Sequence, residues 1–395
     1  MFQLVNQTQD YAWGSPTAIP EILGSPGTSA PVAELWMGAH PSAPSCAVTE
    51  LGDVPLDELV AADPERLLGT DVVARFGPCL PYLLKVLAAA TPLSLQVHPR
   101  IDQARAGFDA EEAAGIALTR PERNYKDRNH KPEVIRALTP LEALCGFRTP
   151  GEAAQRVAGL GAPLAKDLHA ILTSTTDDAV EIAVRHLLGS PRPSADQVDA
   201  VADACRVRLE AGSPDPEADR LVVRLADVYP GDPGVVASLL LNHVTLAPGE
   251  AMFVPAGSVH AYVHGVAVEV MANSDNVLRA GLTSKHKDTA ELLATIDYTP
   301  APPRRISPEV SGATAVFRAP VDDFVLSFTT VDDDGEHRCP GSGPRIVFCL
   351  EGQVNLRVAA GQTGVLTRGD SVFVPASDGA LTLTGRGVVA QADVP

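Results

Sequence analysis

Residues 246–265 read LAPGEAMFVPAGSVHAYVHG, and residues 366–385 read LTRGDSVFVPASDGALTLTG, so one pattern occurs twice at a spacing of 120 residues. Each copy has a turn ending in Gly-Glu or Gly-Asp, a strand ending in Phe-Val-Pro-Ala, and then a further strand. Hairpins repeated in this way are typical of jelly-roll barrels, so we expect two barrels. Because Ala380 stands where the first copy has His260, only the first barrel is expected to hold a metal through that position.

The sequence around the repeat divides into further parts. Residues 1–150 combine short apolar runs with many prolines and glycines, which is typical of short strands joined by turns. Residues 151–228 instead predict a helical insert. Strand and turn patterns return over 229–310, the expected remainder of the first barrel, and over 311–395, the expected second barrel without a metal site. The predicted fold is mostly β, with two jelly-roll units and a helical domain.

The helical insert is predicted from the spacing of its apolar residues. Two sets recur at i, i+4, i+7 and i+8, which places each set on one face of a helix. The sets are Leu164, Leu168, Ile171 and Leu172, and Val180, Val184, Leu187 and Leu188. Ser194 and Gln197 have the spacing of a capping box at the start of a third helix. Beyond the insert, the three leucines at 239–241 are predicted to form a strand.

The overall composition excludes several classes of partner. The 395-residue chain has 49 acidic and 31 basic residues, and its net charge of −18 disfavours nucleic acid and anionic membranes as partners. No apolar run approaches the ~18 residues of a membrane span, and the first residues, MFQLVNQTQDYAWG, lack the features of a secretory leader. The six cysteines include no CxxC pair, which argues against a disulfide framework and a thiolate zinc site. We therefore expect a cytoplasmic protein.

Two short motifs in the first part carry side chains that bind metals. In LQVHP, Gln96 and His98 point to the same face if the segment is a strand, because side chains alternate along a strand. In NHKPE, the proline favours extended backbone at Lys131 and so tends to send Lys131 and Glu133 the same way. Each motif alone also fits a simpler role, as hydrogen-bonded polar residues at a strand end or as a charged loop.

His260 is the third candidate. It follows a proline–glycine turn after an apolar strand, so its imidazole is expected to face the barrel interior. The alternative is a core histidine, but its absence from the second copy of the repeat favours a ligand. Two imidazoles, one carboxylate and one amide suit zinc, although manganese, cobalt and ferrous iron also fit. The set lacks thiolates, which favours a catalytic over a closed structural site; its members are Gln96, His98, Glu133 and His260.

A third group of polar residues follows His260. Glu269, Asp275 and Arg279 lie where an apolar strand ends and a polar turn begins. For Asp275 and Arg279 the alternative is an ordinary surface ion pair, which stabilises a protein little.

With these motifs, the chain resembles the type I mannose-6-phosphate isomerases, a family of cupin (jelly-roll) enzymes. The resemblance spans most of the chain, and its blocks keep the order and spacing of that family. The blocks are YAWGS at 11–15, ELWMGAHPSAPS at 34–45, KVLAAATPLSLQVHP at 85–99, NHKPE at 129–133, VPAGSVHAY at 254–262 and SDNVLRAGLTSKHKD at 274–288. The helical insert and the second barrel carry little of it.

The resemblance implies roles for particular residues. A single zinc ion is expected on Gln96, His98, Glu133 and His260. Arg279 is implied as the catalytic arginine, and Lys131, Glu269 and Asp275 are expected beside the reacting atoms. Ser94, Lys85 and Tyr262 are expected to line the substrate pocket.

The implied reaction interconverts mannose 6-phosphate and fructose 6-phosphate by proton transfer between C1 and C2 through a cis-enediol, without a redox cofactor. Zinc and cations such as Lys131 and Arg279 would stabilise the enediolate. The base stays open between Glu269, Asp275, His260 and a water on the metal. The expected partner is a small phosphosugar, the expected state is a monomer, and the expected context is mannose breakdown or the synthesis of activated mannose.

Two other functions fit parts of the sequence. A cupin oxygenase holding ferrous iron would also use histidines and a glutamate inside a jelly roll, but it leaves the lysines unexplained. A sugar-phosphate sensor without turnover would keep the pocket, although the intact ligand set and Arg279 argue against it.

Overall fold

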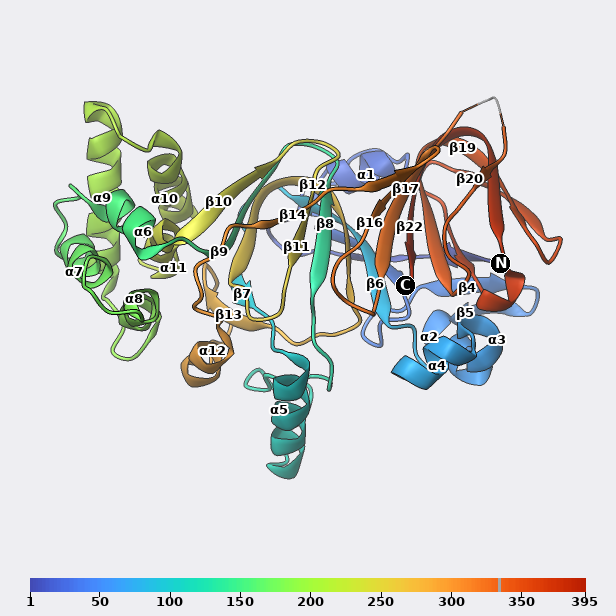
Figure 1. Cartoon of the computed structure of the whole chain (residues 1–395), viewed down its shortest axis with the longest axis horizontal. Helices are drawn as coiled ribbons and strands as arrows, with labels where there is room; N and C mark the ends of the chain where they lie inside the picture. Colours follow the sequence, from blue (N-terminus) through green and yellow to red (C-terminus); the bar gives the residue numbers. More distant parts are fainter. Residues whose placement is uncertain (333–334) are drawn as a thin grey trace.

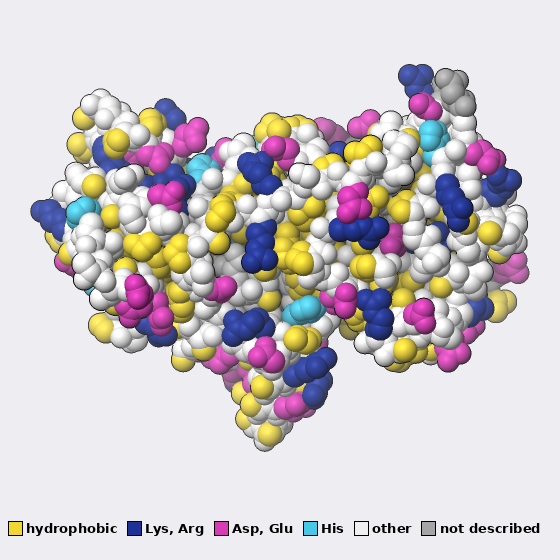
Figure 2. Space-filling view, in the orientation of Figure 1, with side chains coloured by type: hydrophobic (Ala, Val, Ile, Leu, Met, Phe, Trp, Pro, Cys, Tyr) yellow, Lys and Arg dark blue, Asp and Glu magenta, His cyan; other side chains and the backbone are white. Residues whose placement is uncertain are grey.

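The computed structural model describes residues 1–332 and 335–395. The molecule is elongated, with a helical cluster at one end, a β-rich body in the middle and a second β-rich body at the other end (Figure 1). Within the described ranges, two antiparallel sheets of eleven strands each build these bodies. Acidic and basic side chains are interspersed over the face seen in Figure 2, so the net charge of −18 is not gathered into one patch there.

The middle body is organised around the 13-residue strand β12. Residues Gly265 to Ala272 of this strand pair with β6 on one side, and its C-terminal part also pairs with β8, whereas its first residues pair with β7 and β9. Strand β12 therefore joins the two halves of the sheet. The strands of this body are β2 (Gln7–Gln9), β3 (Glu34–Gly38), β6 (Tyr82–Ala89), β7 (Leu95–Val97), β8 (Glu133–Ala137), β9 (Leu141–Phe147), β10 (Leu241–Leu246), β11 (Ala251–Val254), β12 (His260–Ala272), β13 (Leu278–Gly281) and β14 (Arg304–Ile306).

The second body has the strand order β15-β16-β17-β22-β19-β21-β1-β4-β5. The N-terminal strand β1 pairs with β21, so the first residues of the chain complete the sheet of the last ones. Its strands are β1 (Phe2–Val5), β4 (Cys46–Thr49), β5 (Gly52–Pro55), β15 (Glu309–Ser311), β16 (Thr314–Phe317), β17 (Val325–Val331), β18 (His337–Arg338), β19 (Arg345–Val358), β20 (Thr363–Thr367), β21 (Ser371–Val374) and β22 (Leu381–Asp393).

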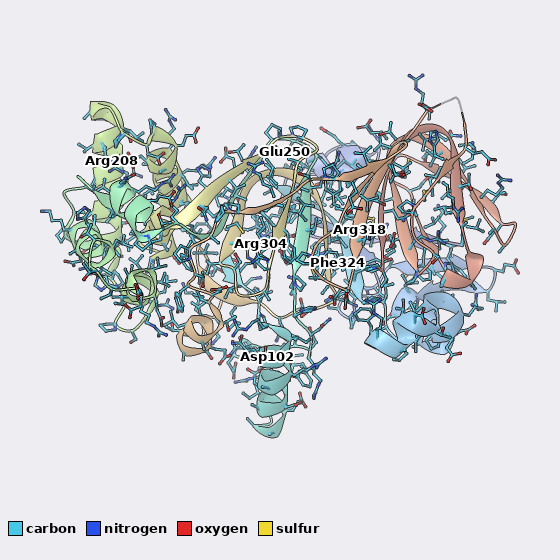
Figure 3. The ribbon with its side chains drawn as sticks, viewed as in Figure 1. Asp102, Arg208, Glu250, Arg304, Arg318 and Phe324 are labelled. Carbon is cyan, nitrogen blue, oxygen red and sulfur yellow. The ribbon has the colours of Figure 1, made fainter. Side chains whose placement is uncertain are left out.

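The helical cluster lies where the spacing of apolar residues predicts it. Leu164, Leu168 and Leu172 are buried on α7, and the capping box of Ser194 and Gln197 begins α9. Arg208, labelled in Figure 3, belongs to this cluster. Its helices are α6 (Pro150–Val157), α7 (Pro163–Leu172), α8 (Ala179–Leu188), α9 (Ala195–Ala211), α10 (Pro216–Val228) and α11 (Gly234–Ala237). None of the described helices is both long and apolar enough to cross a membrane.

Two sequence-based expectations for the secondary structure need correction. The stretch 1–150, which was expected to consist mainly of short strands, also contains α1 (Ala18–Ile22), α2 (Leu56–Ala62), α3 (Pro64–Leu68), α4 (Thr70–Phe76) and the longer α5 (Ile101–Ala113). The first four have five to seven residues, too few to show a helical period. Only Leu241 of the predicted leucine strand begins β10, because residues 238–240 form a 3₁₀ turn, η1. A short apolar run fits a strand and a helical turn equally well, so the sequence alone does not distinguish the two. The remaining short elements are α12 (Thr289–Thr295) and the 3₁₀ turn η2 (Ala376–Asp378).

The two copies of the sequence repeat have matching structures. The backbone N–H of Ala247 donates to Glu250 Oε2 at 2.7 Å, and that of Thr367 donates to Asp370 Oδ2 at 2.9 Å. Each turn has a glycine with positive φ, at +94° for Gly249 and +95° for Gly369, a conformation that favours glycine. The repeat therefore marks one structural unit that occurs in both bodies.

The packing of alternate side chains determines which residues face the interior of the middle body. Leu95 and Val97 belong to the core cluster shared with the helical cluster, so Gln96 between them points the other way. On β6, Leu84 and Val86 pack toward the second body, so Lys85 between them faces the interior of the first. Alternating burial thus places both polar side chains on the same interior surface.

Candidate metal centre and active-site cavity

The strands β7, β8 and β12 bring the predicted metal ligands together. His260 opens β12 and lies opposite Gln96 of β7, while Glu133 opens β8 and His98 directly follows β7. The glycine of the Pro-Ala-Gly turn before His260, Gly257, has φ +84°, which permits the tight turn that aims the imidazole inward.

The ligand atoms of this cluster lie close to one another. His98 Nε2 is 3.2 Å from Glu133 Oε1, and His260 Nε2 is 3.4 Å from Glu133 Oε2. Gln96 Nε2 lies 3.3 Å from His260 Nε2. Candidate ligand atoms of His98, Glu133 and His260 all fall within 4.8 Å of one another, and the three residues are buried. All four predicted ligands are therefore in one place.

Both imidazoles are oriented by backbone carbonyls. His98 Nδ1 lies 2.8 Å from the carbonyl of Asn276, and His260 Nδ1 lies 2.9 Å from that of Ser258. Nδ1–H therefore donates to a carbonyl in each ring, and the Nε2 lone pair faces the cluster, as metal-binding histidines are usually held. Burial lowers the pKa of His98 to about 4, so the ring is neutral near pH 7. Its buried Nε2 has no hydrogen-bond partner, which a metal ion would supply.

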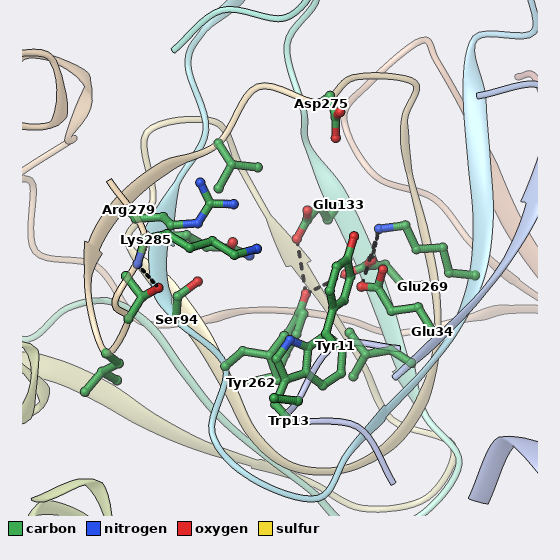
Figure 4. A pocket seen from close by; sticks show the side chains of 18 of the residues that line it. Tyr11, Trp13, Glu34, Ser94, Glu133, Tyr262, Glu269, Asp275, Arg279 and Lys285 are labelled. Carbon is green, nitrogen blue, oxygen red and sulfur yellow. Dashed lines mark hydrogen bonds and ion pairs between the residues drawn. The ribbon is translucent and has the colours of Figure 1, made fainter. Parts of the chain in front are cut away.

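A second polar layer lies beside these ligands. Lys131 Nζ is 3.5 Å from Glu133 Oε1. The hydroxyl of Tyr262 lies 3.2 Å from Glu133 Oε2 and 3.0 Å from Glu269 Oε1, and Lys85 Nζ donates to Glu269 Oε2 at 3.2 Å. The Tyr262 hydroxyl thus connects the carboxylates of Glu133 and Glu269, each of which also has a lysine beside it, as the dashed lines in Figure 4 show in part.

The environment shifts the pKa values of these groups in different directions. Burial raises the pKa of Glu269, and the charge of Glu133 adds to the rise while Lys85 opposes it. Burial also tends to raise the pKa of Glu133, but His98 and Lys131 outweigh burial and hold it well below its usual range. Burial tends to lower the pKa of Lys85, but Glu34 and Glu269 outweigh burial and raise it. Lys85 therefore stays charged near pH 7, and Glu269 accepts a proton more readily than Glu133 does.

A cavity of about 320 Å³ opens over this layer. Its lining includes every predicted site residue except His98 and His260, which lie beneath its floor. Arg279 and Ser94 lie on one side and Glu269 on the other (Figure 4). Asp275 is exposed at the edge, and in the described part of the chain it forms no ion pair with Arg279. The surface ion pair considered for these two residues is therefore absent from the described part of the chain.

Several lining residues were not predicted from the sequence. They are Tyr11, Trp13, Glu34, Trp36, Tyr229 and Lys285. All of them except Tyr229 fall inside the motif blocks quoted above, but no ligand spacing singles them out. Tyr229 directly follows α10 and lines the cavity. Its hydroxyl donates to the carbonyl of Pro92 at 2.8 Å. Only the packing of the helical cluster on the barrel reveals it.

Comparisons with known proteins give one consistent picture. Residues 1–150 match the family model "Phosphomannose isomerase type I, catalytic domain", and residues 313–393 match "Mannose-6-phosphate isomerase, cupin domain". The mannose-6-phosphate isomerase of Shigella flexneri is 41% identical over 398 residues, covering 99% of each chain. That of Rattus norvegicus is 32% identical, covering 96% of this chain and 94% of its own.

Solved structures agree with these relatives. A mutant of phosphomannose isomerase from Salmonella typhimurium superimposes with a TM-score of 0.91 at 38% identity, covering 100% of this chain and 99% of its own. A zinc-bound holo form of mannose 6-phosphate isomerase gives a TM-score of 0.90 at 38% identity with the same coverage.

Proposed function

Because the chain belongs to the type I phosphomannose isomerase family, we propose that it interconverts D-mannose 6-phosphate and D-fructose 6-phosphate. The observation that carries this proposal is the buried cluster of His98, Glu133 and His260 beneath a cavity that also contains cations. An aldose–ketose isomerase needs such a site, because it must stabilise the negative oxygen that forms when a proton leaves the carbon next to a carbonyl.

Zinc is the metal that this cluster would hold. Two imidazoles and a carboxylate, with the amide of Gln96 beside them, are nitrogen and oxygen ligands that suit zinc. The orphaned Nε2 of His98 supports the fit. When bound, zinc supplies a positive charge that polarises a substrate oxygen. The ligands we propose are Gln96, His98, Glu133 and His260.

The cationic side chains would stabilise the enediolate. Lys131 lies 3.5 Å from Glu133, and Arg279 lines the cavity without a hydrogen-bond or ion-pair partner among the described residues. A guanidinium without a protein partner keeps its donors available for substrate oxygens. Lys85 is buried on the same surface, while Ser94 and Tyr262 would contact substrate hydroxyls.

Glu269 is the residue we propose as the base. It is buried at the cavity, and its raised pKa makes its carboxylate a better proton acceptor near neutral pH than an ordinary glutamate. It would take the proton from C2 of the open-chain aldose to form the cis-enediol and return that proton to C1, while a proton passes from O2 to O1. His260 is less suited, because its Nδ1–H donates to the carbonyl of Ser258 and its Nε2 is a proposed metal ligand. Asp275 is exposed at the cavity edge, where it could assist substrate entry or binding.

We also propose a division of the chain that follows these roles. Residues 1–150 and 229–310 would form the catalytic cupin barrel, 151–228 the helical insert and 311–395 a cupin-like barrel without a metal. The helices between Pro150 and Val228 and the matching hairpins at 246–265 and 366–385 support this division.

A cytoplasmic monomer is the state we propose for the working enzyme. All six thiols are free, which fits a reducing compartment.

The direct test is conversion of mannose 6-phosphate to fructose 6-phosphate by the purified protein, measured with and without oxygen. We expect turnover that is indifferent to oxygen. Turnover that requires oxygen and iron would instead indicate the oxygenase, and binding of the phosphosugar without turnover would indicate a sensor.

A further inference from the structure

Lys85 is surrounded by side chains from two neighbouring strands. Strand β6 places it directly opposite Trp36 of β3 on one side and Glu269 of β12 on the other. Glu34 lies two residues before Trp36 and therefore on the same face of β3. The sequence pattern Glu-x-Trp on one strand thus faces a lysine on the next.

Trp36 contacts both charged groups. Its indole N–H donates to Glu34 Oε2 at 2.7 Å, and the Lys85 ammonium lies 5.2 Å from its ring centroid, within the range of a cation–π contact. The ring of His40 packs edge-on against the indole at 4.8 Å between centroids. The indole is 6% exposed and is therefore fixed by its packing.

Lys85 and Glu34 form a charge pair that is less direct than the pair between Lys85 and Glu269. Lys85 Nζ is 3.8 Å from Glu34 Oε1, beyond hydrogen-bond distance, and 3.2 Å from Glu269 Oε2. With Oε2 of Glu34 bonded to the indole, Oε1 is the atom left to face Lys85. All four side chains line the cavity, so the position of the ammonium bears on the substrate.

We propose that Trp36 and Glu34 are positioning residues that hold the Lys85 ammonium against the reacting part of the substrate. This inference rests on the proposed isomerase function and extends it. The indole N–H orients Glu34, Glu34 draws the ammonium away from a contact with Glu269 alone, and the indole ring supports the ammonium from one side. The Lys85 ammonium then interacts with both carboxylates. The negative charge of Glu269 is therefore neutralised less than it would be if Lys85 contacted Glu269 alone.

This positioning role differs from a general structural role, because Trp36 and Glu34 would act on the Lys85 ammonium, whose charge stabilises the transition state. Loss of an interaction that forms only in the transition state lowers kcat and kcat/KM together and leaves KM nearly unchanged. Loss of packing in the core would instead lower the melting temperature and the amount of active protein.

The test compares Trp36→Phe and Glu34→Gln with the wild-type, zinc-loaded protein. Trp36→Phe keeps an aromatic ring and loses the N–H donor, whereas Glu34→Gln keeps the shape and loses the charge. Each should lower kcat about tenfold, since a hydrogen bond to a charged group is involved, with KM changed less than about twofold. Zinc content should match wild type. Glu65→Gln removes a comparable charge from the exposed surface of α3 and should leave kcat unchanged.

The double variant decides whether the two residues act together. Because both changes disrupt one arrangement, Trp36→Phe should cost little in the Glu34→Gln background, so the double variant should resemble Glu34→Gln alone. If the two changes lower kcat independently, so that their effects multiply in the double variant, or if both single variants keep wild-type kcat, the inference is wrong.

If Trp36→Phe does not fold, Glu34→Asp replaces it. This variant keeps the charge and should retain a higher kcat than Glu34→Gln. An equal decrease in kcat in both Glu34 variants would count against the inference. Wild-type turnover is measured first, since its absence would contradict the isomerase proposal itself.

Discussion

Arg279 lines the cavity, and its guanidinium has no hydrogen-bond or ion-pair partner among the described residues. We predict that Arg279→Ala lowers kcat by about 100-fold or more, because removal of one preorganised donor commonly costs that much. Zinc content should not change, since Arg279 is not among the proposed ligands. Arg279→Lys should recover part of the loss through its charge but not through its donor geometry. Wild-type turnover in Arg279→Ala, measured by the isomerisation assay, would exclude a catalytic role.

His40 gives a prediction about stability and pH. It is 3% exposed, and burial lowers its pKa from 6.5 to about 4. Above pH 6.5 it is neutral in both states, so its contribution to stability is complete there. As the pH falls from 6.5 toward 4, the unfolded chain takes up a proton before the folded protein does, and stability is lost.

The size of this effect can be measured by urea unfolding at several pH values. Between pH 7.5 and pH 5 the free energy of unfolding of the wild type should fall by about 2 kcal/mol more than that of His40→Gln, whose amide does not titrate. The exposed His264, changed to glutamine, serves as the control and should keep the wild-type pH profile. Identical profiles for wild type and His40→Gln would show that His40 titrates alike in both states.

At the residue level, the sequence indicated the residues of the candidate metal cluster better than it indicated their neighbours. Gln96 and His98 are two residues apart, which is the period of a strand, and Lys131 and Glu133 flank a proline that favours extended backbone. Local geometry alone therefore indicates that the side chains of each pair point the same way. Trp36 and Glu34 matter because β3 lies beside β6. Strand pairing between residues about fifty positions apart is not encoded in local spacing, and these two residues could not be identified as part of the site.

Among the elements, helices with a clear apolar stripe were predictable, whereas short ones were not. The stripes of α7 and α8 follow the 3.6-residue period of a single helix and are therefore visible in the sequence. Helices α2, α3 and α4 are stabilised by burial of a few residues such as Leu56, Leu67 and Val72 against the second body. Tertiary packing decides their conformation, so their sequences alone do not.

The helical cluster contains a buried ion pair that joins α9 and α10. Arg208 donates to both carboxylate oxygens of Asp219, at 2.8 and 2.5 Å, and also to the carbonyls of Arg156 and Ala158. Asp219 is fully buried. We predict that Asp219→Asn lowers the free energy of unfolding by about 3 kcal/mol, because it leaves a buried guanidinium without its counter-charge.

The matched control lies on the surface of the same helix. Asp227 pairs with Arg206 at 2.6 Å, but its side chain is 63% exposed, so Asp227→Asn should change stability by less than about 1 kcal/mol. Urea unfolding measures both variants, and kcat of the folded protein should be unchanged in each. A folded Asp219→Asn protein with reduced kcat would show instead that the helical cluster acts on the site.

Across the whole molecule, the two bodies share a hairpin but differ at its chemically important positions. Val254 pairs with Glu133 in the first body, and Val374, its counterpart in the repeat, pairs with Arg345 in the second. Arg345 is fully buried and donates to the carbonyls of Gly341 and Gly379, the second of which precedes Ala380. The second body therefore has a buried cation, Arg345, at the position where the first has Glu133, the carboxylate that we propose as a metal ligand.

We propose that isomerase activity of this chain depends on one zinc ion bound by Gln96, His98, Glu133 and His260. The most direct test of this dependence is to remove metal from the purified protein with a chelator and titrate zinc back while measuring bound zinc and mannose-6-phosphate isomerisation on the same samples. We expect no turnover without metal and a linear recovery that ends when one zinc is bound per chain. Full turnover in the metal-free protein, or none after one zinc has bound, would contradict this proposal.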